Sequence, residues 1–400
     1  MKVGGTLVFR QDYWYWTIIH SLVVEQHFRI LRISQNHQEV WLQSNRSKGP
    51  NVVRMLRYDL DWSNWMQRDI EVTSQKAELM RKRLYKRNLN AVNIYISTYP
   101  PVDDWKFRTE EPLIVGNNKQ TSLQTIVVSS NTLQQDLADL SAELQIPLTI
   151  EDEGILFDYT KLELLKSKVI SVSNHRIKEE KKLFTYGKPY FTYIFIFIQL
   201  LLFGVLELQG GSMDPDVLMK YGAKDNPSII EGEWWRFITP IFIHIGFLHL
   251  LMNTLALYYL GTAVERIYGR IRFFLLYLFA GFTGSLASFV FSPAISAGAS
   301  GAIFGCFGAL LFFGVTHPSL FFRTMGKNIV GIILINVAIG FMIPGIDNAG
   351  HIGGLVGGFL ASSIVHLPHQ RKYSMRVLSV FITLILTLIM LYLGYTSSFR

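Results

Sequence analysis

The sequence predicts a bundle of apolar, membrane-spanning α-helices that follows a soluble, mixed α/β domain. The chain has 400 residues, of which 50% are hydrophobic and only 17% are charged. The charged residues are concentrated before about residue 188, whereas the remainder is mostly apolar and interrupted by short polar links. In that remainder, apolar stretches of about 16–22 residues recur, close to the length that a helix needs to cross the hydrocarbon core.

The N-terminal region mixes strand-like and helix-like patterns. Short apolar or alternating runs predict strands at residues 28–34, 39–43, 52–58, 91–97 and 123–129. Apolar stripes at helical spacing predict helices at residues 12–27, 62–86 and 132–144. We therefore assign residues 1–160 to a soluble α/β domain, which is large enough to bury its own core. Residues 161–189 form a basic, helical linker that ends in a Gly-Lys-Pro break.

Seven candidate spans follow the linker, at about residues 190–208, 237–260, 272–291, 299–316, 328–343, 350–366 and 376–395. The fourth, fifth and sixth are short for a full crossing and contain glycine and polar residues. Such segments are tolerated at membrane depth where they are buried in protein or line a water-filled cavity. The pattern therefore predicts a bundle that encloses a hydrated cavity.

Lysine and arginine are distributed unevenly among the links between the spans. They occur after the second, fourth and sixth spans, at Arg266, Arg270, Arg272, Arg323, Lys327, Arg371, Lys372 and Arg376. The links at 292–298 and 344–349 contain none. Because basic links stay in the cytoplasm, we expect a multi-pass cell-membrane protein with a cytoplasmic N-terminus and an external C-terminus.

The net charge of +8 comes largely from basic clusters at residues 81–87 and 176–188. Nucleic acid is one class of partner for such clusters, but the anionic inner leaflet is the simpler one because a membrane region follows. We expect a lipid bilayer and no nucleic acid. The single cysteine, Cys306, lies in a span, where a packed and unreactive thiol is expected rather than a nucleophile.

Four acidic residues of the soluble domain are close in sequence: Asp59, Asp61, Asp69 and Glu71. Carboxylates of this kind can hold a divalent cation, but solvated acids at helix ends explain the spacing more simply. The histidines of this domain follow no metal-ligand spacing. We expect no metal site and no cofactor, and the ligand of the domain, if it has one, stays open.

A serine and a histidine begin two of the apolar segments. Ser300 lies in the glycine-rich run at 296–305, and His351 lies in the run at 350–358. A polar group in lipid is costly unless it has a partner or a function. A histidine within about 2.6–3.2 Å of a serine hydroxyl can remove its proton and make it a nucleophile. Asp347 precedes the sixth span rather than lying in it, so a dyad is more plausible than a triad.

The second span adds three polar side chains. His249 and Asn253 are four residues apart and share one helix face, and His244 lies nearer the outer end. A helix that begins near Ile241 would place His249 about 12 Å deep. These side chains can act as hydrogen-bonding groups between helices. Beside a serine and a histidine, they can instead donate N–H groups to an oxyanion, together with the backbone N–H of Ser300.

Small residues recur one turn apart on the fourth and sixth spans: Gly301, Gly305, Gly353, Gly354, Gly357 and Gly358. Such faces let helix backbones approach closely. Packing of the fourth span against the sixth through these glycines would bring Ser300 to His351. The same faces are also typical of helix packing without catalysis.

Together these motifs resemble the rhomboid intramembrane serine proteases. The matching segments, in order and spacing across residues 190–366, are Glu233-Trp-Trp-Arg236, His244, His249–Asn253, Gly261-Thr-Ala-Val-Glu-Arg266, Gly298-Ala-Ser-Gly301 and Gly350-His-Ile-Gly-Gly354. The resemblance implies a six-helix core at 190–366. The N-terminal domain and a seventh helix within 367–400 are similar to those of a bacterial subgroup with a cytosolic domain. Many members have Ala where this chain has Gly350, and the glycine should be tolerated.

The resemblance also implies roles for individual residues. Ser300 would be the nucleophile, His351 the base, and His249 with Asn253 the oxyanion-stabilising pair. The remaining active-site candidates are His244, Trp235, Arg236, Gly298 and Gly301. Tryptophan at this position is also an ordinary interfacial anchor. The implied reaction is the cleavage of transmembrane protein substrates near the outer face of the membrane.

Two other functions remain as alternatives. An inactive rhomboid-like adaptor would bind membrane proteins without cutting them, and the intact Ser300 and His351 argue against it. A transporter or channel would use His244 and His249 to line a path. It would also need charged residues inside several spans, and the sequence has almost none.

Overall fold

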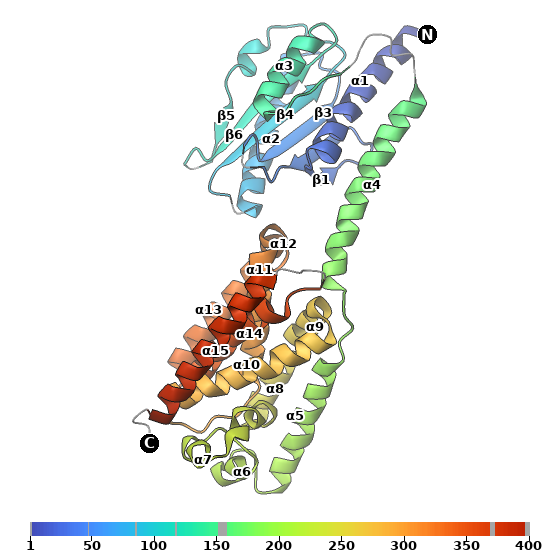
Figure 1. The fold of residues 1–400 in the computed structure, drawn as a ribbon. Helices are drawn as coiled ribbons and strands as arrows, with labels where there is room; N and C mark the ends of the chain where they lie inside the picture. Colours follow the sequence, from blue (N-terminus) through green and yellow to red (C-terminus); the bar gives the residue numbers. More distant parts are fainter. Residues whose placement is uncertain are drawn as a thin grey trace. The chain divides into compact units, whose positions relative to one another are not determined.

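The structure is a computed structural model that describes residues 2–46, 48–84, 86–116, 118–150, 158–368 and 373–396. It divides into two compact units, Met1–Glu179 and Glu180–Arg400 (Figure 1). The first unit is mixed α/β and the second is helical. The predicted fold class is therefore confirmed.

The first unit is built on a six-stranded sheet with the order β1-β2-β3-β4-β6-β5. Its strands are β1 Arg29–Ile33, β2 Glu39–Gln43, β3 Val52–Arg57, β4 Leu89–Ile96, β5 Leu113–Val115 and β6 Thr121–Val128. The central strands β3, β4 and β6 are parallel, and the outer pairs are antiparallel. Five of these strands match the predicted ones. β5 was missed because its three residues are mostly exposed at the sheet edge, so no buried face marks it in the sequence.

Helices cover both faces of this sheet because its strands alternate apolar side chains between two cores. The helices are α1 Lys2–His20, α2 Ser63–Arg83, α3 Leu133–Leu144 and α4 Tyr159–Phe184. Val53 and Met55 of β3 belong to one core with α1, α3 and the first turns of α4. Val52 belongs to a second core with Met66 and Ile70 of α2. The first unit is thus a three-layer arrangement.

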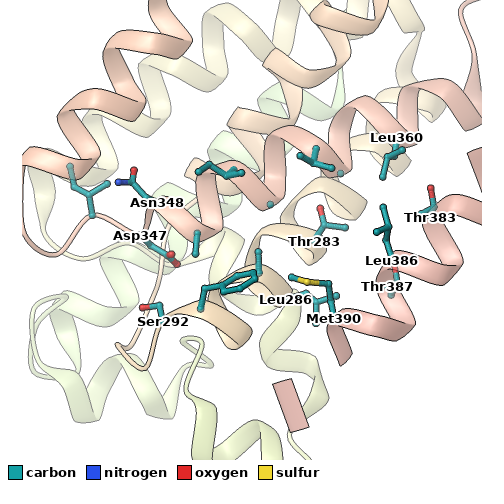
Figure 2. Close-up of a pocket in the computed structure, with 18 of the residues that line it drawn as sticks. Thr283, Leu286, Ser292, Asp347, Asn348, Leu360, Thr383, Leu386, Thr387 and Met390 are labelled. Carbon is teal, nitrogen blue, oxygen red and sulfur yellow. The ribbon is translucent and has the colours of Figure 1, made fainter. Parts of the chain in front are cut away.

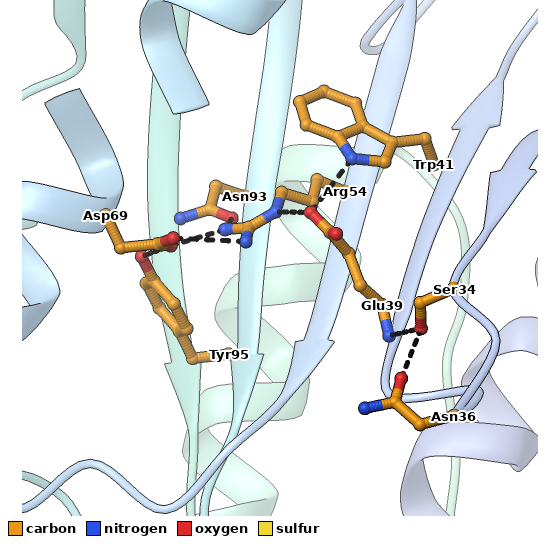
Figure 3. Close-up of polar contacts among 8 residues, drawn as sticks. All are labelled: Ser34, Asn36, Glu39, Trp41, Arg54, Asp69, Asn93 and Tyr95. Atoms are coloured by element: carbon orange, nitrogen blue, oxygen red, sulfur yellow. Dashed lines mark hydrogen bonds and ion pairs between the residues drawn. The ribbon is translucent and has the colours of Figure 1, made fainter. Parts of the chain in front are cut away.

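One buried arginine interrupts the α2 face of the sheet. Arg54 is 3% exposed and forms ion pairs with Glu39 at 2.7 Å and with Asp69 at 2.5 Å. It also donates to Asn93 Oδ1 at 3.0 Å, and the Tyr95 hydroxyl donates to Asp69 at 2.6 Å (Figure 3). The charge is paired on both sides, which is the condition under which a buried ion is tolerated.

The acidic residues of the first unit are explained by contacts of this kind. Asp69 pairs with Arg54, and Asp59 accepts from the backbone N–H of Thr98 at 2.9 Å. Asp61 and Glu71 are exposed. Across the described residues, no group of three or more His, Cys, Asp or Glu side chains is placed to hold a metal ion.

The second unit is a helical bundle (Figure 1). Its main helices are α5 Phe191–Leu208, α8 Phe247–Ala256, α9 Thr262–Tyr268, α10 Arg270–Phe291, α11 Ser300–Thr316, α12 Pro318–Thr324, α13 Gly326–Met342, α14 Asn348–Val365 and α15 Tyr373–Thr396. Two short helices, α6 Pro215–Lys220 and α7 Asn226–Ile230, lie between α5 and α8.

Four described segments are long and apolar enough to cross a membrane: Phe191–Leu208, Phe247–Tyr268, Arg270–Phe291 and Arg376–Thr396. The bent pair α12 and α13, at 71°, makes a fifth if counted as one span. α11 is a shorter apolar helix of 17 residues that is buried along most of its length. α11, α13 and α14 have 17, 17 and 18 residues, in line with the predicted short fourth, fifth and sixth spans.

The second predicted span begins later than expected. Residues before it form two short 3₁₀ turns, Trp234–Phe237 and Thr239–Phe242, and α8 starts only at Phe247. Gly246 precedes the helix with φ of 78°, a conformation that breaks a helix and suits glycine. His249 therefore lies in the first turn of α8, and the expected helix start near Ile241 was wrong. His244 lies outside the helix.

A buried carboxylate joins this span to α5. Glu265 in α9 is fully buried and accepts hydrogen bonds from the backbone N–H groups of Tyr190, Phe191 and Thr192 at 2.8–3.0 Å. It also accepts from the Thr192 hydroxyl at 2.7 Å. These are N–H groups at the start of α5, which the helix itself leaves without partners. Glu265 thus caps α5 from a neighbouring helix.

Candidate active site

Helices α11 and α14 touch backbone to backbone. A Cβ atom at Gly354 would overlap the carbonyl oxygen of Gly301, and a Cβ atom at Gly358 would overlap that of Gly305. Only glycine permits this approach. The predicted contact between the fourth and sixth spans is present, and it lies next to Ser300 and to the turn that carries His351.

The second pair of glycines on α14 has a different partner. A Cβ atom at Gly353 would overlap Ala287 of α10, and one at Gly357 would overlap the Thr283 hydroxyl. The prediction that both pairs pack against the fourth span was therefore wrong. α14 is held between α10 and α11 by two glycine faces, which fixes it on two sides.

Ser300 is the first residue of α11 and is partly buried. The His351 ring stacks on Phe304, with 4.2 Å between ring centroids and 8° between planes. Phe304 lies one turn after Ser300 on the same helix face, so the imidazole lies against the turn that Ser300 begins. The described contacts include no hydrogen bond between the two side chains, and catalytic hydrogen bonds often tighten only when substrate is bound.

The Nδ1 atom of His351 is buried and has no hydrogen-bond partner within the described part of the chain. A buried polar atom without a partner is uncommon and requires an explanation, such as a catalytic role. Asp347 does not supply one. Its Oδ1 accepts from the Gly350 backbone N–H at 2.8 Å, which caps the start of α14.

Gly350 fits this cap. A Cβ atom there would lie 2.8 Å from Asp347 Oδ2, closer than such contacts allow. An alanine at this position would push the Asp347 carboxylate out of its place. The glycine therefore belongs with the aspartate cap of α14 in this chain.

Two histidines from the second span contact the segment just before Ser300. His244 is fully buried, and its Nε2 accepts from the Ala299 backbone N–H at 3.2 Å. His249 packs against Gly298, where a Cβ atom would lie 2.6 Å from its ring. The two rings lie 5.4 Å apart. Together they hold the backbone at residues 298–299, immediately before Ser300.

Asn253 is 6% exposed and lies one turn after His249. Its Nδ2 donates to the His249 carbonyl oxygen at 2.9 Å. An amide nitrogen carries two hydrogens, so the second remains for another acceptor. The first hydrogen bond fixes the orientation of the side chain.

These residues fall within one known domain. A family model described as the rhomboid domain matches residues 231–368, which include every site residue above. The rhomboid protease GluP of Bacillus subtilis (strain 168) is 41% identical over 392 residues, which cover 98% of this chain and 76% of GluP. The chain belongs to the rhomboid family. It is a multi-pass intramembrane serine protease, as the sequence predicted, and the adaptor and transporter alternatives are set aside.

Other rhomboids match a shorter part of the chain. The putative rhomboid protease YdcA of Bacillus subtilis (strain 168) is 38% identical over 150 residues, which are 37% of this chain and 75% of YdcA. RHOMBOID-like protein 1 of Arabidopsis thaliana is 39% identical over 160 residues, 39% of this chain and 41% of its own length. The similarity to GluP, in contrast, extends through the soluble domain.

The Trp-Arg motif of this rhomboid has one buried and one exposed member. Arg236 is 7% exposed, pairs with Glu233, and donates to the carbonyl oxygens of Met219 and Ala223 at 2.8 Å each. Trp235 is 43% exposed. Arg236 thus organises the loop before α8. Trp235 remains available as an interfacial anchor or a substrate contact.

Lys224 is a structural residue that the sequence did not reveal. Its side chain is fully buried, and Nζ donates to the carbonyl oxygens of Ser292 and Ala294 at 2.6 and 2.9 Å. Its backbone forms a two-way bridge with Ser296. Burial lowers the pKa of Lys224 to about 8. Lys224 therefore ties down the segment that leads to Ser300, and nothing in its local sequence marks that role.

Proposed function

We propose that Ser300 and His351 are the catalytic dyad of this rhomboid protease. The observation that carries the proposal is the stack of His351 on Phe304, one turn from Ser300, together with the unpartnered Nδ1 atom. The glycine contact between α11 and α14 supports it, because it holds the two helices at backbone distance directly after the pair.

The chemistry is acyl transfer. His351 takes the Ser300 hydroxyl proton as Oγ bonds to a peptide carbonyl carbon, and the carbonyl oxygen becomes an oxyanion. The tetrahedral intermediate then breaks its C–N bond, and His351 gives the proton to the departing amine. Water, deprotonated by His351, hydrolyses the ester to release the second product and restore Ser300.

The oxyanion needs hydrogen-bond donors that are already in place. We assign this role to the side chains of His249 and Asn253 and to the backbone N–H of Ser300. The last belongs to the first turn of α11, where the N–H groups have no partner within the helix and the helix dipole is positive. His244 acts as a positioning residue through its bond to Ala299.

Charge distribution supports cleavage near the outer face. The N-termini of α11 and α14 adjoin links 292–298 and 344–349, which contain no Lys or Arg. The basic residues Arg270 and Arg272 begin α10 at its opposite end. By the positive-inside rule, we infer a cytoplasmic N-terminus, an external C-terminus and a site that opens outward in the cell membrane. The substrates would be transmembrane proteins with weakened helices near that face.

The test is cleavage of a transmembrane reporter co-expressed with the full chain. Ser300→Ala is expected to abolish cleavage while the protein still accumulates in the membrane. Ser288→Ala is the matched control, because Ser288 is an equally apolar-flanked buried serine on α10. Cleavage by Ser300→Ala at the wild-type rate would show that the nucleophile lies elsewhere.

Orientation has a separate test with a membrane-impermeant maleimide on intact cells. A cysteine in place of Thr396, at the exposed end of α15, is expected to react from outside. A cysteine in place of His175, exposed in the soluble unit, is expected to react only after lysis. Labelling of the cysteine at position 175 in intact cells, with labelling at position 396 only after lysis, would place the N-terminus outside and the C-terminus in the cytoplasm.

A further inference from the structure

A cavity of about 660 Å³ lies between α10, α14 and α15, away from the dyad (Figure 2). Its lining is mostly apolar, and neither Ser300 nor His351 contributes to it. Ser292 and Asp347 lie at one end of it, and Leu360 and Thr383 lie at the other. The cavity is therefore elongated along α14, with a polar end where that helix begins.

The cavity exists because α15 touches the rest of the bundle unevenly. Near its C-terminal end, Tyr395 packs against Phe289 of α10, with 5.5 Å between ring centroids. Further back, Thr383, Leu386 and Thr387 line the cavity. The helix is otherwise largely exposed, with 11% of its apolar window buried. A space of this kind in hydrocarbon is filled by something apolar.

The cavity is long enough to cross one leaflet of a bilayer. Asp347 and Leu360 are separated by thirteen positions, about 20 Å at the helical rise of 1.5 Å per residue. The hydrocarbon core is about 30 Å thick, so that one leaflet contributes about 15 Å. The polar end at Ser292 and Asp347 then lies at the level where lipid headgroups begin.

The lining between the two ends of the cavity is apolar, with Ile352, Val356 and Leu386 among its residues. A hydrocarbon chain has no polar group that such a lining would leave without a partner, so a single acyl chain suits it.

We propose that this cavity binds one acyl chain of a membrane phospholipid, with its headgroup beside Ser292 and Asp347. The bound chain would pack on Ile352 and Gly353, which follow His351 on α14, and would fill the gap beneath α15. It would thus support the helix that carries the proposed base. The Asp347 carboxylate and the Lys224 ammonium, which donates to the Ser292 carbonyl oxygen, put both signs of charge at this end, so the matching probe is the zwitterionic dipalmitoyl phosphatidylethanolamine.

The first test is native mass spectrometry of the full chain in detergent with this lipid added. Wild type is expected to retain one lipid. Thr387→Trp puts an indole into the cavity and is expected to reduce the retained lipid at least fivefold. Leu388→Trp is the matched control, because Leu388 is the next residue on α15, is 63% exposed, and does not line the cavity. It should retain the lipid.

A second variant and a second measurement cover the case in which Thr387→Trp does not fold. Val356→Trp fills the cavity from α14, where Val356 is 47% exposed. Because a ligand that binds the folded state stabilises it, added lipid should raise the Tm of wild type and of Leu388→Trp. The rise should be lost in Val356→Trp.

Two results would overturn the proposal. One is equal lipid retention, or an equal rise in Tm, in wild type and in the filled variants. The other is photo-crosslinking of a transmembrane reporter substrate to Thr387 or Val356, which would make the cavity a substrate site instead of a lipid site.

Discussion

The Arg54 cluster of the soluble unit and the histidines of the membrane unit differ in how their buried groups are paired. In the soluble unit, Arg54 is enclosed by Glu39, Asp69 and Asn93, and its charge is matched on the sheet face. In the membrane unit, His351 and His244 each have a buried Nδ1 atom without a partner in the described part of the chain. A buried charge with its counter-charges in place has a structural role, whereas unpartnered imidazole nitrogens near Ser300 fit the proposed active site.

The same distinction holds inside the membrane unit. Glu265 accepts four hydrogen bonds and caps α5, and Lys224 donates to two carbonyl oxygens before Ser300. Both are buried charges with a structural role. The proposed dyad differs from them because its members lack such contacts.

Removal of the proposed base should have the largest effect. His351→Ala is expected to reduce reporter cleavage by about 10⁶-fold, which in practice is below detection, because loss of one member of a catalytic unit costs nearly as much as loss of all. His317→Ala is the control, since His317 also stacks on a phenylalanine of α11. A His351→Ala protein that retains cleavage within tenfold of wild type would contradict the assignment.

Removal of Arg54, the ion-paired arginine of the soluble unit, should lower stability and leave the cleavage reaction unaffected. Arg54→Ala leaves the partly buried Glu39 and Asp69 without a counter-charge, which costs up to about 3–5 kcal/mol. Hydrogen exchange of the full-length protein should become faster in β3 and β4, while reporter cleavage persists. Arg32→Ala is the control, because Arg32 is exposed. Unchanged exchange in β3 would show that the ion pairs contribute little.

Removal of an oxyanion donor should lower the rate without unfolding the protein. Asn253→Ala is expected to reduce kcat by about 10²–10³, equivalent to about 2.7–4 kcal/mol, with KM little changed. Asn336→Ala is a close control, because Asn336 also donates Nδ2 to the carbonyl four residues before it, on an exposed face of α13. Equal rates for the two variants would remove Asn253 from the oxyanion site.

Disruption of the glycine contact should have the smallest effect of the four. Gly354→Ala brings a methyl group into the Gly301 carbonyl and should destabilise the protein by about 1–3 kcal/mol. Gly331→Ala meets no atom within 4 Å and is the control. The measurement is the Tm of the two variants in detergent, where Gly354→Ala should unfold at the lower temperature. Equal Tm values would mean that α11 and α14 are not closely packed.

Much of the fold could be predicted because periodic apolar patterns decide it. The strands at 39–43 and 52–57 and the helix at 300–316 have clear apolar runs with turn residues at their ends. The proposed dyad could also be predicted, since Ser300 and His351 are unusual residues for an apolar segment and the glycines beside them are spaced for close contact.

The remaining features depend on contacts that are distant in sequence. The late start of α8 depends on the backbone at Gly246, and an apolar run cannot distinguish a 3₁₀ turn from a helix. The role of Lys224 depends on carbonyls about 70 residues away. Glu265 caps a helix about 74 residues before it. Nothing local in the sequence marks either of these polar residues as buried.

The most direct test of the dyad is covalent labelling of the full-length protein with a fluorophosphonate, which reacts with an activated serine. We expect one adduct, located by peptide mass spectrometry at Ser300, and we expect it to disappear in His351→Ala. Labelling at another serine, or labelling of Ser300 that persists without His351, would contradict the account.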